Sequence, residues 1–148
     1  MGKITFHSEG VPYVLPNKAL FRQWITETAL SHGKRVGGLA FVFCSDDYLL
    51  EMNKQYLNHD YFTDIITFDY ADGDVIAGDI FISVDRVEDN ACKNLVDKKT
   101  EMQRVVIHGV LHLCGYKDKQ KKEITIMREK EQFYLRILPQ FLKTKRST

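Results

Sequence analysis

The architecture of this chain is organised around residues 105–118, which read Val-Val-Ile-His-Gly-Val-Leu-His-Leu-Cys-Gly-Tyr-Lys-Asp. The helix that this run predicts is apolar on nearly every side apart from its two histidines, and such a helix lies buried in its protein. His108 and His112 are four residues apart, so their side chains lie on one face, one turn from each other. Gly115 favours a left-handed helix end, after which a turn can bring Asp118 back toward the histidines.

These three side chains predict a metal site. Two imidazole nitrogens and one carboxylate oxygen, with a fourth position open for a reactive water, are the ligand set of a catalytic zinc site. An unpaired buried imidazole costs about 1–3 kcal/mol, and metal ligation offsets that cost. We therefore expect His108, His112 and Asp118 to hold a metal ion with its bound water. The alternative is a capped helix end whose histidines bond to the backbone.

The composition bounds the remaining possibilities. The chain has 148 residues, 44% hydrophobic and 28% charged, and a net charge of +1 that gives no global attraction to nucleic acid or membrane. It contains no apolar run near the roughly 20 residues that span a bilayer, and its N-terminus lacks a signal-peptide pattern. Three separated cysteines suggest neither disulfides nor a cysteine cluster. We expect one cytoplasmic domain, residues 1–148.

Strand signals come early in the chain and helix signals dominate late. The expected strands are two short ones within residues 1–15, then 39–44, 65–70 and 75–82, the last two forming a hairpin. The expected helices are about 17–31, 46–56, 83–95, 100–114 and 121–138, the fourth opened by a Thr100–Gln103 capping box and the last stopped by Pro139. This order predicts an α+β fold, a small mixed sheet covered by about five helices, with the metal site at the C-terminal end of the buried central helix.

The residue after His108 limits the chemistry. Metallopeptidases of the HExxH type need a glutamate there as general base, and this chain has Gly109. A peptidase or amidase is therefore disfavoured. Phosphodiester hydrolysis fits better, since a metal ion can polarise a phosphoryl oxygen and activate its own water without a strong side-chain base.

Three blocks of sequence carry a family resemblance. Residues 108–116 match the first nine positions of the pattern His-Gly-x-Leu-His-Leu-x-Gly-Tyr-Asp-His, and residues 53–68 are similar to Asn-x-x-Tyr-Arg-x-x-Asp-x-Pro-Thr-Asp-Val-Leu-Ser-Phe. Residues 78–83 are similar to Gly-Asp-Ile-x-Ile-Ser. In their order along the chain, 53–68, 78–83 and 108–116, the blocks resemble the YbeY family of metal-dependent endoribonucleases, and the resemblance covers about residues 40–135. The resemblance implies that His108 and His112 are metal ligands, and that the protein matures ribosomal RNA.

Three departures from the family pattern bear on the site. The third histidine of the family falls on Asp118, which makes the site harder and more negative; one zinc ion per chain is expected, with manganese or magnesium less favoured. The arginine expected to hold phosphate falls on Leu57, which cannot do so. His59 could contact phosphate if protonated, although a histidine on an exposed loop more often has no such role. Phe62 replaces the proline of the family.

Other residues near these blocks receive supporting roles. Thr63 and Asp64 are interpreted as structural support that caps the turn before a strand. Asp79 is interpreted as a hydrogen-bond partner of a metal-ligating histidine. The candidate RNA-binding cations flank the proposed metal, and the alternative for them is an ordinary solvated helix start: Lys117, Lys119, Lys121 and Lys122. The basic tail at Lys143, Lys145 and Arg146 is interpreted as a solvated end.

The resemblance predicts a zinc-dependent endoribonuclease that hydrolyses ribosomal RNA precursors, with roles in 16S RNA processing, ribosome maturation and quality control. Its expected partners are ribosomal RNA and the small ribosomal subunit, with no membrane and a monomeric state. Leu57 stands where the family has an arginine, and this departure supports an alternative: a ribosome-associated RNA-binding factor whose metal only stabilises the fold.

Overall fold

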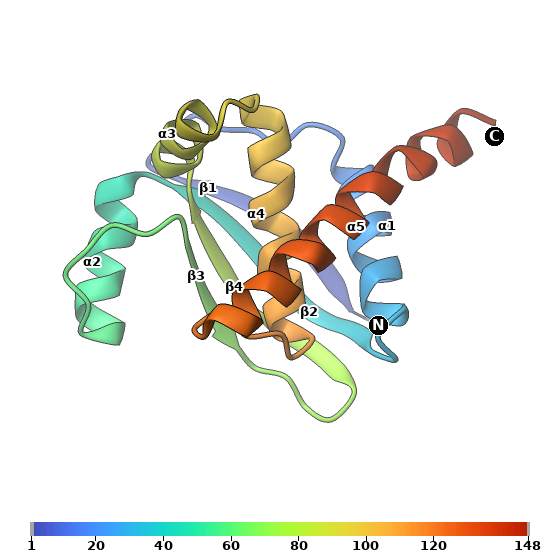
Figure 1. Cartoon of the computed structure of the whole chain (residues 1–148), viewed down its shortest axis with the longest axis horizontal. Helices are drawn as coiled ribbons and strands as arrows, with labels where there is room; N and C mark the ends of the chain where they lie inside the picture. The colour runs from blue at the N-terminus through green and yellow to red at the C-terminus, as the bar shows by residue number, and fades with distance from the viewer. Residues whose placement is uncertain (1, 148) are drawn as a thin grey trace.

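A four-stranded mixed β-sheet forms the middle of the molecule (Figure 1). The computed structural model describes the chain from residue 2 to residue 147, with side chains up to residue 141. Across the sheet the strands follow the order β1 (Lys3–Glu9), β2 (Arg35–Cys44), β4 (Val75–Ser83) and β3 (Ile65–Asp69). The pairs β1–β2 and β2–β4 are parallel, and β3 runs antiparallel to β4. The predicted hairpin and α+β class are confirmed.

Between residues 2 and 147, five helices pack around this sheet: α1 (Lys18–Leu30), α2 (Asp46–Leu57), α3 (Val84–Asn94), α4 (Lys98–Leu113) and α5 (Lys121–Ser147). Because strand side chains alternate between faces, β4 sends Ile80 and Ile82 into the main core with α1, α4 and α5. Phe81 joins a smaller apolar cluster with Leu49 of α2 on the other face. In Figure 1, α4 crosses the sheet and α5 crosses α4. In the described part of the chain, no helix combines the length and apolarity needed to cross a bilayer.

Three predicted element boundaries are wrong. Residues 11–15 form no second strand, because Pro12 within this segment and Pro16 directly after it lack the backbone donors that a ladder needs. The N-cap of α4 is Asp97, whose carboxylate accepts from the Thr100 amide (2.7 Å), so the Thr100–Gln103 box lies inside the helix. Pro139 does not end α5, since the helix continues to Ser147.

Gly109 allows α4 to lie directly on the sheet. A Cβ at this position would meet the Ile65 Cδ1 at 3.0 Å and the Ile80 side chain at 3.2 Å. Both isoleucines belong to strands under the helix, so position 109 faces the sheet. A glutamate at 109 would therefore point into the core and could not act as a base beside the histidines.

We expect Gly109→Ala to lower the free energy of unfolding by about 1–3 kcal/mol, because the extra methyl group overpacks this contact. The gain of about 1 kcal/mol that alanine brings to a helix interior would offset only part of the overpacking cost. Urea unfolding measures it, with Gly38→Ala as control, because a Cβ at Gly38 meets nothing within 4 Å. Equal stability of Gly109→Ala and the wild type would show that α4 can move off the sheet freely.

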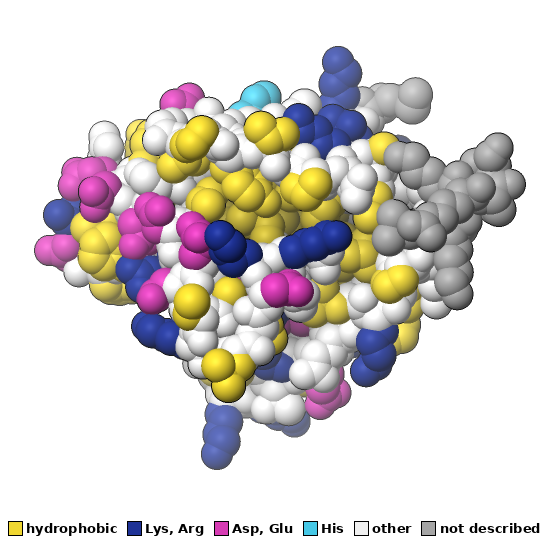
Figure 2. Space-filling view, turned by 90° about the horizontal axis from the view of Figure 1, so that it is seen from above, with side chains coloured by type: hydrophobic (Ala, Val, Ile, Leu, Met, Phe, Trp, Pro, Cys, Tyr) yellow, Lys and Arg dark blue, Asp and Glu magenta, His cyan; other side chains and the backbone are white. Residues whose placement is uncertain are grey.

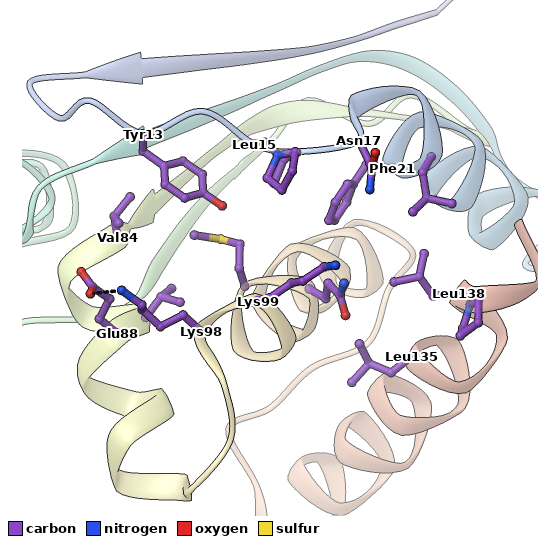
Figure 3. A pocket seen from close by; sticks show the side chains of 16 residues that line it. Tyr13, Leu15, Asn17, Phe21, Val84, Glu88, Lys98, Lys99, Leu135 and Leu138 are labelled. Carbon is purple, nitrogen blue, oxygen red and sulfur yellow. Dashed lines mark hydrogen bonds and ion pairs between the residues drawn. The ribbon is translucent and has the colours of Figure 1, made fainter. Parts of the chain in front are cut away.

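An apolar cavity of about 430 Å³ lies at the N-terminal end of α4. Figure 2 shows hydrophobic side chains gathered in a hollow on this face of the molecule, and Figure 3 shows the wall from close by. Lys98 stands at its edge and forms an ion pair with Glu88 (2.8 Å). Within the described residues, the cavity shares no lining residue with the histidine site, which lies at the other end of the helix.

Candidate metal centre

The end of α4 brings the three predicted ligands together. The imidazole rings of His108 and His112 lie one turn apart, with centroids separated by 4.5 Å. Gly115 follows the helix with a φ of 110°, and the Gly115 amide donates to the His112 carbonyl. This reversal returns the chain over the histidines. The Asp118 Oδ2 atom lies 3.2 Å from His108 Nε2 and 3.4 Å from His112 Nε2.

The spacing of these atoms fits a metal ion. A tetrahedral zinc ion with ligand bonds of about 2.0–2.1 Å separates its ligand atoms by about 3.3 Å. The two distances from Asp118 match that value, and all three ligand atoms lie within 4.8 Å of one another. Two nitrogens and one carboxylate oxygen also suit zinc chemically. The described residues therefore fit a single ion with a coordination position left for water.

Hydrogen bonds at the far side of each ring set the tautomers for ligation. The His112 Nδ1–H donates to the Tyr116 carbonyl (2.9 Å), and the His108 Nδ1–H donates to Glu131 Oε2 (2.5 Å). Each Nε2 atom then carries the lone pair that a metal needs, and such partners hold ligating histidines in place. The backbone bond that was the alternative to ligation is thus present at His112, but it uses the opposite nitrogen.

Asp79 does not supply either of these hydrogen bonds, and its predicted role is corrected. The Asp79 carboxylate accepts from the Tyr70 hydroxyl (3.1 Å) and lines a groove beside α2. Alternation along β4 explains its position: Ile80 faces α4, so Asp79 and Phe81 face the other side of the sheet.

Glu131 of α5 is the centre of a buried ionic network behind the site. Its side chain is 2% exposed, and besides His108 it contacts Arg104 Nη1 (3.1 Å) and Arg128 Nη1 (3.2 Å). Burial acts to raise the pKa of the Glu131 carboxyl, but the His108 hydrogen bond and the Arg104 charge outweigh it, and the pKa lies below its ordinary value. Glu131 is therefore an anion that supports the basicity of the His108 ring.

Arg104 links the predicted supporting residues to this network. Its guanidinium donates to Glu101 (2.6 Å) and lies 3.6 Å from the Asp64 carboxylate. Burial acts to lower the pKa of Arg104, while the carboxylates of Glu101 and Glu131 raise it above its ordinary value. Thr63 donates to the carbonyl of Ile65, the first residue of β3, at 3.4 Å, a local bond where the loop enters the strand.

An open cavity of about 790 Å³ lies over the three ligands. Its wall also includes Leu57, His59, Lys117 and Lys119, whereas Lys121 and Lys122 do not line it within the described residues. The His59 ring stacks on Tyr61, and its Nδ1 shares a hydrogen bond with the Tyr61 hydroxyl (2.9 Å). The tail cations Lys143, Lys145 and Arg146 lie outside the residues whose side chains are described.

Comparison with known proteins identifies the family. A sequence model described as endoribonuclease YbeY matches residues 9–139. The chain belongs to the YbeY family. The relative from Phocaeicola vulgatus, named endoribonuclease YbeY, is 52% identical over 128 residues, covering 86% of this chain and 93% of the relative. The YbeY of Parabacteroides distasonis is 46% identical over 137 residues, covering 93% of this chain and 96% of the relative.

A solved structure shares the fold of this YbeY chain. It is the solution structure of TM1509 from Thermotoga maritima, with a TM-score of 0.66 and 27% sequence identity. The likeness covers 97% of this chain and 93% of TM1509. The family resemblance inferred from the three sequence blocks is confirmed by these matches.

Three charged residues of the YbeY site were not predicted from the sequence: Arg104, Arg128 and Glu131. A signal for two of them was available. Arg104 precedes His108 by four residues and so shares the face of the histidines. Glu131 occupies a core-facing position of α5 between Met127 and Tyr134, where a lone carboxylate needs a buried partner.

Proposed function

We propose that this chain is a zinc-dependent endoribonuclease that hydrolyses phosphodiester bonds in ribosomal RNA precursors. The observation that carries the proposal is the convergence of three ligand atoms within 4.8 Å of one another on the wall of an open cavity, with Asp118 at tetrahedral spacing from both histidines. The names of its YbeY relatives support the nuclease activity. We further propose that it acts in the cytoplasm, on RNA of the small ribosomal subunit.

The side chains around the ligands fit a polyanionic substrate. Lys117 and Lys119 lie on either side of Asp118 in the cavity wall and offer charge to phosphate oxygens without reading the bases. A divalent ion bound by the three ligands would supply a polarised phosphoryl oxygen and an activated water. The glutamate base of the HExxH peptidases is replaced here by Gly109, and position 109 faces the sheet.

Asp118 bears on the choice of metal. A carboxylate is a harder ligand than imidazole and brings a negative charge, which widens the range of acceptable ions toward manganese and magnesium. Two nitrogen ligands from the histidines still favour zinc. We therefore propose zinc as the native ion.

One observation favours a second candidate, an RNA-binding factor with a structural metal. Leu57 lines the cavity where the family pattern has an arginine, and it offers no hydrogen bond to a phosphate. However, α4 is buried by apolar contacts that do not involve the ligands, including Val106, Ile107 and Leu111. A metal is thus not needed to hold this helix, which favours the catalytic role.

Elemental analysis and RNA cleavage together test the proposal. We expect purified protein to contain about one zinc ion per chain and to cut structured ribosomal RNA. A chelator would abolish cleavage and added zinc would restore it, with manganese and magnesium tested in parallel. Metal-replete protein that binds RNA but leaves it intact would support the RNA-binding factor. Protein that takes up no metal would refute both candidates.

A further inference from the structure

We propose that Arg128 binds a phosphate group of the RNA substrate beside the metal centre. This inference rests on the proposed function, since it assigns a substrate contact in the same cavity. Four cationic side chains line that cavity in the described part of the chain: Arg104, Lys117, Lys119 and Arg128. Two of them are arginines, whose planar guanidinium groups can donate two parallel hydrogen bonds to a phosphate.

Arg104 is not available for a phosphate. Its Nε and Nη2 atoms donate to the Glu101 carboxylate, and its Nη1 donates to Glu131. The side chain is only 17% exposed, and the Asp64 carboxylate closes the remaining side at 3.6 Å. Three carboxylates thus neutralise this one cation, so Arg104 holds the network together.

Arg128 has the opposite properties. Its side chain is 56% exposed, and its one ion pair in the described residues joins Nη1 to Glu131 Oε1 at 3.2 Å. The Nε and Nη2 atoms make no hydrogen bond or ion pair within that part of the chain. The bond to Glu131 restricts the Arg128 side chain before any ligand binds. An anion that binds the two open nitrogens would therefore cost less side-chain entropy than one that binds a freely moving arginine.

Glu131 also fixes where that anion would lie. One carboxylate oxygen of Glu131 accepts from Arg128 while the other accepts from His108 (2.5 Å). A single buried carboxylate therefore separates the open guanidinium from a metal ligand. Lys117 and Lys119 reach the cavity from the turn at Asp118, whereas Arg128 reaches it from α5. A phosphate held by Arg128 would thus lie beside the metal centre.

The test compares Arg128→Ala, Arg128→Lys and the matched control Arg136→Ala in zinc-loaded protein. Arg136 is an exposed arginine on the same helix, about 12 Å further along its axis by the helical rise, and does not line the cavity. The probe is a labelled single-stranded ribosomal RNA fragment. Its affinity is measured by anisotropy over a series of salt concentrations, before cleavage products accumulate, and kcat and KM are measured by gel.

We expect Arg128→Ala to weaken RNA binding and raise KM about tenfold, as for a lost charged hydrogen bond. The slope of log affinity against log salt should fall by about 0.7, the value for one phosphate contact on a single strand. Arg128→Lys keeps the salt slope but recovers only part of the affinity, because the fork is lost. Arg136→Ala behaves like the wild type, and all variants keep the wild-type zinc content.

An Arg128→Ala protein with wild-type affinity and salt slope would overturn the proposal. So would loss of zinc from that variant, which would show that Arg128 acts only through Glu131. If the wild type binds RNA without cutting it, a reduced salt slope in Arg128→Ala still supports the phosphate contact while the nuclease proposal fails. If the wild type neither binds nor cuts RNA, both are refuted.

Discussion

The His112→Ala protein is expected to fold normally, to contain almost no metal and to leave RNA uncut. Removing this ring takes away one of three ligands and leaves only His108 and Asp118, too few to hold zinc firmly. The fold should survive, because α4 is held by apolar residues such as Val106 and Leu111, which are fully buried. Elemental analysis, circular dichroism and a gel-based cleavage assay measure the three properties.

The matched control is His7→Ala, which removes an exposed imidazole from edge strand β1. This control should keep wild-type metal content and cleavage. A His112→Ala protein that melts, while any folded fraction retains RNA affinity, would indicate a structural metal and the RNA-binding factor. A His112→Ala protein that still cleaves RNA would contradict the metal site itself.

The second large effect is expected at Glu131. Replacing Glu131 by glutamine keeps the shape of the side chain but removes the anion that accepts from His108 Nδ1. Loss of such a partner typically lowers metal affinity about 10–100-fold. Zinc affinity is measured by competition with a chromophoric chelator. The control is Glu129→Gln, which changes an exposed carboxylate on the same helix.

Glu131→Gln also tests how the stability of the fold depends on pH. The folded-state pKa of Glu131 lies below its ordinary value, so its network contributes stability above the unfolded pKa of about 4.3. That contribution is lost as the pH falls through the folded-state pKa. We expect metal-free Glu131→Gln to be about 1–3 kcal/mol less stable than wild type at pH 7, and the difference to shrink in acid.

Urea unfolding of metal-free protein at both pH values measures this difference. A difference that stays constant into acid would mean that the Glu131 charge does not stabilise the fold. An unchanged zinc affinity in Glu131→Gln would mean that the His108 ring needs no anionic partner.

The local parts of the site were predictable from sequence because one short segment contains them. The four-residue spacing of His108 and His112 fixes their common face, and Gly115 provides the positive φ that returns Asp118. The succession of helices and strands along the chain, and the β3–β4 hairpin, followed in the same way from apolar periodicity with capping and turn signals, whereas the order of strands across the sheet was not predicted. These features depend on residues that are close together in the sequence, so the local sequence pattern is sufficient to predict them.

The remaining parts depend on packing between distant segments. Glu131 reaches His108 only because α5 crosses α4, and no local pattern specifies that crossing. Asp79 was misassigned because the family motif does not reveal which face of β4 lies under α4. The cap of α4 was misplaced because Asp97 and Thr100 are both good capping residues, and only the backbone geometry distinguishes them.

The histidine ligands and the aspartate ligand project from different kinds of backbone, and this difference has a consequence for ion selectivity. Both imidazoles project from a single turn of a helix embedded in the core, so their separation is rigid. Asp118 instead projects from the irregular segment between α4 and α5, and its side chain is 37% exposed. A larger or smaller cation could be accommodated by shifting that segment alone. Discrimination by ionic radius would then be weak, and cellular supply would decide which metal is loaded.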